Sequence, residues 1–107
     1  MILSEFAEKL GISPICGNLY REVSGCYAGD LLSWVMSHAG EGDVWVTIMS
    51  NLNVVAVASL TDAACVIMAE GVSPDDDALA AAKEKGIPIF SDSRSVYELC
   101  RDIGKLI

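Results

Sequence analysis

The sequence predicts an α/β fold: a single-domain sandwich in which a small parallel or mixed sheet is flanked by helices. Short runs rich in β-branched and apolar residues recur along the chain, each of the length of a buried strand. Segments with apolar residues three and four apart lie between these runs, and this alternation is typical of such a sheet. With 107 residues, of which 52% are hydrophobic, the chain can build one core.

The first helix is predicted over residues 3–10, where apolar residues fall at i, i+3, i+4 and i+7 and Gly11 follows as a left-handed C-cap. Pro14 then favours an extended segment through residues 15–16. After a Gly-Asn turn, residues 19–23 are expected to form a short strand.

A second helix is expected after Asp30, which can cap it. Gly40 closes this helix, whose apolar face repeats at helical spacing through Leu32, Val35, Met36 and Ala39. The run that follows, residues 44–49, is β-branched and almost wholly apolar, as expected of a strand covered on both faces.

Residues 51–60 fit two structures. Their valines favour a strand, whereas Asn51 or Asn53 as an N-cap with alanines following favours a helix, and we predict the helix. Residues 64–69 are then a second buried strand.

A helix is predicted before the third apolar strand, and residues 73–77 carry several signals of a helix N-terminus. Ser73 is expected as the N-cap with Pro74 at the first helical position, and three consecutive carboxylates follow against the positive end of the helix dipole. This helix is expected to end at Lys85, with Gly86 as its C-cap. Residues 87–90 form a short strand, whose proline implies an edge or first-residue position.

The chain is predicted to end in a helix. Ser95 and Glu98 make a capping box, and the apolar residues that follow keep helical spacing: Val96, Leu99, Cys100 and Ile103. No internal repeat or linker is visible, so residues 1–107 are expected to form one domain.

Composition excludes several classes of partner. Fifteen acidic and seven basic residues give a net charge of −8, which repels nucleic acid and anionic membranes. The sequence shows no uninterrupted apolar span and no signal peptide, so a cytoplasmic location is expected. Four cysteines without a C-x-x-C pair and a single histidine indicate free thiols and no metal site.

Ligands of open α/β sheets bind beyond the carboxyl ends of the strands, near helix N-termini. Three small polar loops could form such a pocket for a phosphate or a small polar molecule: residues 24–30, 49–53 and 91–95. Alternatively, Asp30, Asn51 and Ser95 serve only as helix caps. The sequence contains neither a P-loop nor a dinucleotide-binding fingerprint.

Cys26 is the thiol expected to be most exposed and most acidified by a helix dipole. A cysteine nucleophile needs a base, and the one histidine, His38, lies about three turns down the following helix. Residues 75–77, all aspartate, are interpreted as a solvated helix start because consecutive helical side chains diverge. Trp45 is expected in the core. Trp34 lies off the apolar stripe of its helix and is either core or an interface anchor.

Residues 21–33, REVSGCYAGDLLS, resemble the signature of the DRTGG domain, approximately D-R-x-V-T-G-G-Y followed by a D-L-L-S helix start. The resemblance continues through residues 42–48, 54–60 and 86–89. The sequence departs from the pattern at three positions: Tyr20 for Asp, Ser24 for Thr and Cys26 for the second Gly.

This resemblance implies a fold like the N-terminal domain of HPr kinase/phosphorylase and of some Mur ligases. It also implies an accessory module, found beside CBS domains and in some phosphotransacetylases, often at a dimer interface. HPr kinase activity resides in a separate P-loop domain, which this sequence lacks. The positions that match the motif are Arg21, Ser24, Gly25, Tyr27 and Asp30.

Three functions follow as hypotheses. The first is a non-catalytic regulatory or protein-interaction module, homodimeric or with a protein partner. The second is a sensor of a nucleotide or phosphorylated metabolite, which would bind at the motif residues and Asn51. The third is a thiol-dependent enzyme using Cys26. No cofactor is expected in any of them.

Overall fold

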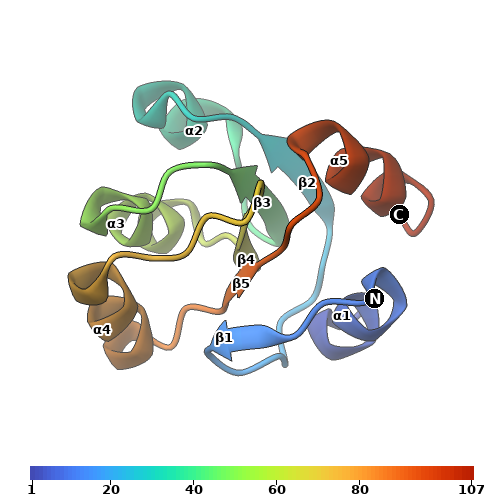
Figure 1. Ribbon diagram of the computed structural model, residues 1–107, viewed down its shortest axis with the longest axis horizontal. Coiled ribbons are helices and arrows are strands. Elements are labelled where there is room, and N and C mark those ends of the chain that lie inside the picture. The colour runs from blue at the N-terminus through green and yellow to red at the C-terminus, as the bar shows by residue number, and fades with distance from the viewer.

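Five strands form one sheet in the order β1-β5-β4-β3-β2 in the computed structural model, which describes residues 1–107 (Figure 1). The strands are β1 (Pro14–Cys16), β2 (Gly25–Ala28), β3 (Asp43–Thr47), β4 (Cys65–Met68) and β5 (Ile89–Ser91). Strands β2 to β5 are parallel to one another, and β1 pairs antiparallel with β5. The sheet is therefore mixed.

Helices cover both faces of the sheet. They are α1 (Leu3–Leu10), α2 (Leu32–His38), α3 (Leu52–Thr61), α4 (Asp76–Lys85) and α5 (Val96–Gly104). Helices α2, α3 and α4 lie on one face, and α1 and α5 lie on the other (Figure 1). This three-layer arrangement confirms the predicted α/β sandwich. No helix is both long and apolar enough to cross a membrane.

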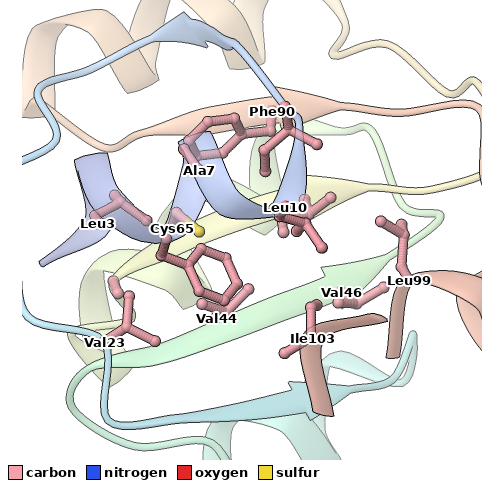
Figure 2. Close-up of a cluster of buried hydrophobic side chains, with 14 of the residues drawn as sticks. Leu3, Ala7, Leu10, Val23, Val44, Val46, Cys65, Phe90, Leu99 and Ile103 are labelled. Carbon is pink, nitrogen blue, oxygen red and sulfur yellow. The ribbon is translucent and has the colours of Figure 1, made fainter. Parts of the chain in front are cut away.

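Successive side chains along the central strands point to opposite faces of the sheet, and they form two hydrophobic cores. Val44 and Val46 face α1 and α5, where they join Phe6, Phe90 and other fully buried side chains (Figure 2). Trp45, between them in sequence, faces the other side and packs under α2, α3 and α4. Because both faces of β3 and β4 are covered, β4 is apolar at every position and β3 at its three central positions.

Several predicted helix ends are confirmed. Gly11 and Gly86 adopt left-handed conformations after α1 and α4, with φ of 78° and 70°. Asn51 caps α3 by accepting a hydrogen bond from the backbone N–H of Asn53. Ser95 and Glu98 form both bonds of the capping box at α5.

Four local predictions are wrong. Residues 19–23 are not a strand of the sheet, because their backbone bonds to the start of α1: Leu3 N–H donates to Arg21 O and Val23 N–H to Met1 O. The strand lies instead at β2, within the segment expected to be a loop. Gly40 is not the C-cap of α2; Ala39 is, with an extended backbone.

The other two errors concern helix caps. Asp30 does not cap α2, whose N-cap is Leu31 without a side-chain bond. Ser73 does not cap α4, which begins at Asp76 after Asp75. The backbone N–H of Asp75 donates to Ser50 O, and its carboxylate accepts from Ser50 Oγ, so a contact between two loops sets where α4 begins.

The two edges of the sheet differ. Strand β1 contains Pro14, has three residues and pairs with β5 through an irregular register. Strand β2 reads Gly-Cys-Tyr-Ala, without a proline or a charged residue, and pairs in regular register with β3 alone.

Candidate functional site

Strand β2 runs through the middle of the motif and separates its residues into two groups. Arg21, Ser24 and Gly25 lie at the amino end of the parallel strands, whereas Tyr27 and Asp30 lie at the carboxyl end. Asn51, at the start of α3, belongs to the carboxyl end. The structure therefore does not gather the six predicted residues into one pocket.

At the amino end, Arg21 binds the end of α3. Its Nη1 donates to Asp62 Oδ1 at 2.7 Å and to the carbonyl oxygens of Asp62 and Ala63 at 3.3 and 3.0 Å. Asp62 itself has a left-handed backbone, with φ of 56°. The guanidinium thus stabilises a helix C-terminus, a favourable position for a cation.

Ser24 and Gly25 are packed against the start of β3. A side chain at Gly25 would place its Cβ 2.8 Å from Asp43 Oδ1, and one at Gly42 would collide with Ser24. A cavity of about 240 Å³ opens beside Ser24 and Gly42, and its other lining residues are Arg21, Glu22, Glu41 and Asp62. Three carboxylates against one arginine that is already paired make this cavity unfavourable for a phosphate.

At the carboxyl end, Asp30 connects the turn after β2 to the end of β3. Its Oδ1 accepts from Thr47 Oγ1 at 2.7 Å and from the Ile48 backbone N–H at 2.9 Å. Thr47 is fully buried, so this carboxylate satisfies a hydroxyl that would otherwise be costly to bury. Nearby, the buried Trp45 indole N–H donates to Gly29 O at 2.9 Å.

A second cavity, of about 380 Å³, lies between the end of β2 and the first turn of α2. Its lining is mainly apolar and comprises Tyr27, Ala28, Gly29, Asp30, Leu31, Trp34 and Val35. Trp34 is 57% exposed and stacks on His38 with ring centroids 4.5 Å apart. Of the two alternatives for Trp34, the core is thus wrong, whereas Trp45 is in the core as predicted.

The three predicted loops do not share a cavity. The loops follow β2, β3 and β5 at the carboxyl edge of the sheet. The polar groups of the loops after β3 and β5 form hydrogen bonds to neighbouring segments of the fold. Asn51 caps α3, and Ser50 bonds to Asp75. The loop after β2 alone lines the apolar cavity.

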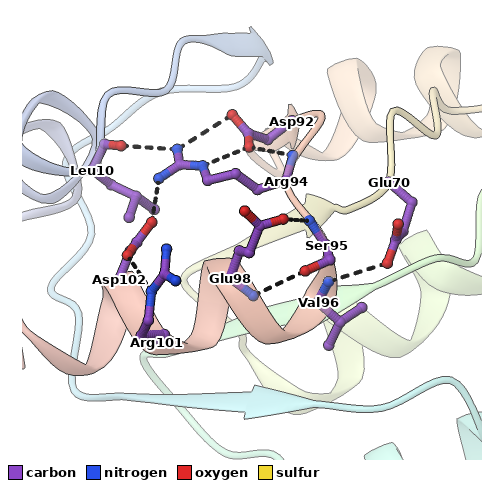
Figure 3. Close-up of polar contacts among 9 residues, drawn as sticks. All are labelled: Leu10, Glu70, Asp92, Arg94, Ser95, Val96, Glu98, Arg101 and Asp102. Atoms are coloured by element: carbon purple, nitrogen blue, oxygen red, sulfur yellow. Dashed lines mark hydrogen bonds and ion pairs between the residues drawn. The ribbon is translucent and has the colours of Figure 1, made fainter.

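The loop after β5 is held by Arg94 (Figure 3). Arg94 donates to Asp92 Oδ2 at 2.7 Å, to Asp102 Oδ2 at 3.1 Å and to Leu10 O at 2.9 Å. The guanidinium holds the pKa of Asp92 below its usual value, chiefly through that hydrogen bond. This arginine joins α1, β5 and α5 and is not free to bind an anion.

Cys26 is not an activated thiol. The residue is exposed, but its sulfur lies beside α5, where burial, followed by the neighbouring Cys100, raises its pKa to about 12. Its side chain is on the α5 face, in register with Val44, whereas His38 stacks against Tyr27 and Trp34 on the α2 face. The expectation of an acidified Cys26 is therefore wrong. No group of three or more His, Cys, Asp or Glu side chains could hold a metal ion.

Sequence reasoning missed Thr47 and the cavity beside α2. Thr47 appears in the sequence as one polar residue in an apolar run, and such a residue needs a buried partner, which is the only signal available. The position of Trp34 off the apolar stripe was the signal for the cavity.

No protein-family model and no curated protein sequence matches the chain. Its fold does match a solved structure, the CBS and DRTGG domains of the regulatory region of Clostridium perfringens pyrophosphatase in complex with an activator, diadenosine tetraphosphate. The TM-score is 0.73 at 14% sequence identity, and the match covers 95% of this chain. The fold is DRTGG-like. This chain spans 45% of the length of that structure.

Proposed function

We propose that residues 1–107 form one cytosolic DRTGG-like regulatory module that has no catalytic activity of its own and acts as a homodimer. The observation that carries this proposal is the match, over 95% of the chain, to a structure from a regulatory region. The site chemistry supports it, because the Cys26 thiol is protonated at neutral pH and Arg21 and Arg94 are both engaged within the fold.

Light scattering tests the proposal directly. The protein is expected to have twice the mass of the chain at micromolar concentration. A monomer at that concentration would contradict the homodimer and leave a module that binds a different protein.

The apolar cavity supports a second candidate, a small-molecule sensor. Its Trp34 face and its volume of about 380 Å³ suit a flat heteroaromatic ring such as a nucleobase. The similar structure, the pyrophosphatase regulatory region, is a complex with a nucleotide activator, diadenosine tetraphosphate. Asp30 lies at the rim of this cavity, but its Oδ1 already accepts two hydrogen bonds.

Thermal unfolding against adenine nucleotides and phosphorylated metabolites distinguishes the two candidates. A ligand present at about 100 times its dissociation constant adds roughly 2.7 kcal/mol, which raises the midpoint by about ten degrees. Under the sensor proposal, Trp34→Ala abolishes this shift. Arg21→Ala, at the opposite end of β2, is the matched variant: loss of the shift there instead would place the ligand at the amino-end cavity. No shift with any compound would exclude the sensor for that panel.

A further inference from the structure

The cavity beside α2 is bordered by two aromatic rings and one carboxylate, those of Tyr27, Trp34 and Asp30. His38 stacks on Trp34 with ring centroids 4.5 Å apart and lies beside Tyr27 with centroids 6.3 Å apart, yet it does not line the cavity. His38 therefore packs against these rings outside the cavity. The part of each ring that lines the cavity stays open to a ligand.

Asp30 offers the cavity one free carboxylate oxygen. Its Oδ1 accepts both hydrogen bonds that the fold gives this side chain, from Thr47 Oγ1 and from the Ile48 N–H. Oδ2 accepts none, and Asp30 is an exposed residue. The two bonds to Oδ1 hold the carboxylate in place, so a ligand that donates to Oδ2 loses little affinity to the ordering of this side chain.

No basic side chain offsets this carboxylate. The sequence has no lysine or arginine between Arg21 and Lys83. Arg21 precedes β2 and Lys83 is in the last turn of α4 before β5, so both lie at the amino end of the strands. Arg94 lies at the carboxyl edge, but it follows β5, which β4 and β3 separate from β2, and it is bonded within the fold. With a net charge of −8 on the whole chain, the cavity repels an anion and attracts a cation.

Aromatic rings beside a carboxylate are suited to an organic cation. The face of an aromatic ring attracts a cation electrostatically, and tryptophan does so most strongly. A flat cation has a face that can stack on Trp34, and its N–H groups can form a charge-assisted hydrogen bond with Asp30 Oδ2. An aromatic amidinium or a protonated amino-heterocycle combines these features, whereas a phosphate has neither.

We infer that the cavity beside α2 binds a planar aromatic cation, which stacks on Trp34 and donates an N–H to Asp30 Oδ2. This inference rests on the proposed sensor and specifies the charge of its ligand. The cavity volume of about 380 Å³ has room for one such ring system. A nucleotide that bound here would have to direct its phosphates away from Asp30.

Three probes of one shape and different charge test the inference: benzamidine is a cation at neutral pH, benzamide is neutral and benzoate is an anion. Calorimetric titration of the wild-type protein should give benzamidine a dissociation constant about tenfold lower than that of benzamide, because cation–π attraction and the ion pair add to the ring contact. Benzoate should show no measurable binding. Trp34→Ala should abolish the binding of benzamidine.

Asp30→Asn separates the ligand contact from the structural one. The asparagine Oδ1 still accepts from Thr47 and Ile48, whereas an NH₂ donor takes the place of Oδ2. The tenfold preference for benzamidine over benzamide should fall to about threefold or less. The matched control is Glu41→Gln, which removes one carboxylate from the amino-end cavity and should leave the preference unchanged.

Several results would overturn the inference. Benzoate that binds as tightly as benzamidine would do so even if Asp30→Asn does not fold, and so would an unchanged preference in folded Asp30→Asn. A preference that is lost in Glu41→Gln but kept in Asp30→Asn would place the cation in the amino-end cavity instead. If adenine nucleotides raise the unfolding midpoint and benzamidine does not bind, the sensor proposal stands without a cationic ligand. If no compound binds, both fail.

Discussion

The two edge strands of this sheet, β1 and β2, differ in how they treat the unpaired backbone groups of a sheet edge. Strand β1 is short, carries Pro14 and is followed by Gly17, whose missing side chain lets the backbone lie against Pro88. Strand β2 is regular and uncharged and leaves its outer groups free. A further strand cannot pair with an edge strand that is short and irregular and carries a proline, whereas it can pair with a regular edge strand whose outer backbone groups are free.

The largest effect is expected from removing the close approach at the β1 edge. Gly17 has φ of 89°, and a Cβ there would lie 2.5 Å from Pro88 Cα. Gly17→Ala combines backbone strain with overpacking against backbone atoms that cannot yield, so we expect a loss of about 3 kcal/mol. Thermal unfolding should show a midpoint about fifteen degrees lower.

Gly40→Ala is the control for this change, because a Cβ at Gly40 meets no atom within 4 Å and the backbone there is not left-handed. It should change stability by less than about 0.5 kcal/mol. Equal losses in the two variants would mean that the β1 edge is not held by this contact.

A smaller effect is expected where β2 ends. Asp30→Ala removes the acceptor for the buried Thr47 hydroxyl and for the Ile48 N–H, which should cost about 2 kcal/mol. Asp30→Asn retains an acceptor oxygen and should recover more than half of the loss in chemical denaturation. If Asp30→Ala is as stable as the wild type and abolishes a nucleotide-induced shift, Asp30 serves a ligand and not the fold.

The last prediction concerns the alkylation rates of the cysteines in the two edge strands, which can be compared without changing the stability of the protein. Cys16 in β1 is buried and its thiol donates to Ile87 O. Cys26 in β2 is exposed, and its pKa is raised to about 12. A raised pKa keeps the thiol protonated at neutral pH, so Cys26 should alkylate about thirtyfold more slowly than an ordinary thiol, even though its rarer thiolate is more nucleophilic.

The rate at Cys26 should rise with pH through 9, since the thiolate fraction increases towards the pKa, and Cys16 should react only on unfolding. Peptide mapping after timed alkylation measures both rates. An ordinary rate at Cys26 near pH 7 would restore the thiol-dependent enzyme as a hypothesis.

Sequence patterns predicted the centre of the fold better than its borders. Strands β3 and β4 were located because burial on both faces requires continuous apolar runs. Strand β2 was missed because glycine and alanine, two of its four residues, have weak strand propensity, and pairing with β3 decides its position. The start of α4 was misplaced for a similar reason, since the Asp75 to Ser50 contact joins residues 25 apart in sequence.

The candidate site was predicted in its residues but not in its arrangement. Local spacing identified Asn51 as a cap, and the motif drew attention to Arg21 and Asp30. It could not show that Arg21 bonds to a residue 41 positions away, or that a strand separates Arg21 from Asp30. Long-range partners of polar side chains are fixed by the tertiary fold, and periodicity carries no information about them.

The fluorescence of the two tryptophans provides separate signals for association and for unfolding. Trp45 is fully buried with its indole N–H bonded to Gly29 O, whereas Trp34 is 57% exposed beside the β2 edge. Acrylamide should therefore quench Trp34 while sparing Trp45 in the folded protein. Loss of that quenching as concentration rises would report dimer formation, and a red shift of the Trp45 emission would report unfolding, both in the unlabelled protein.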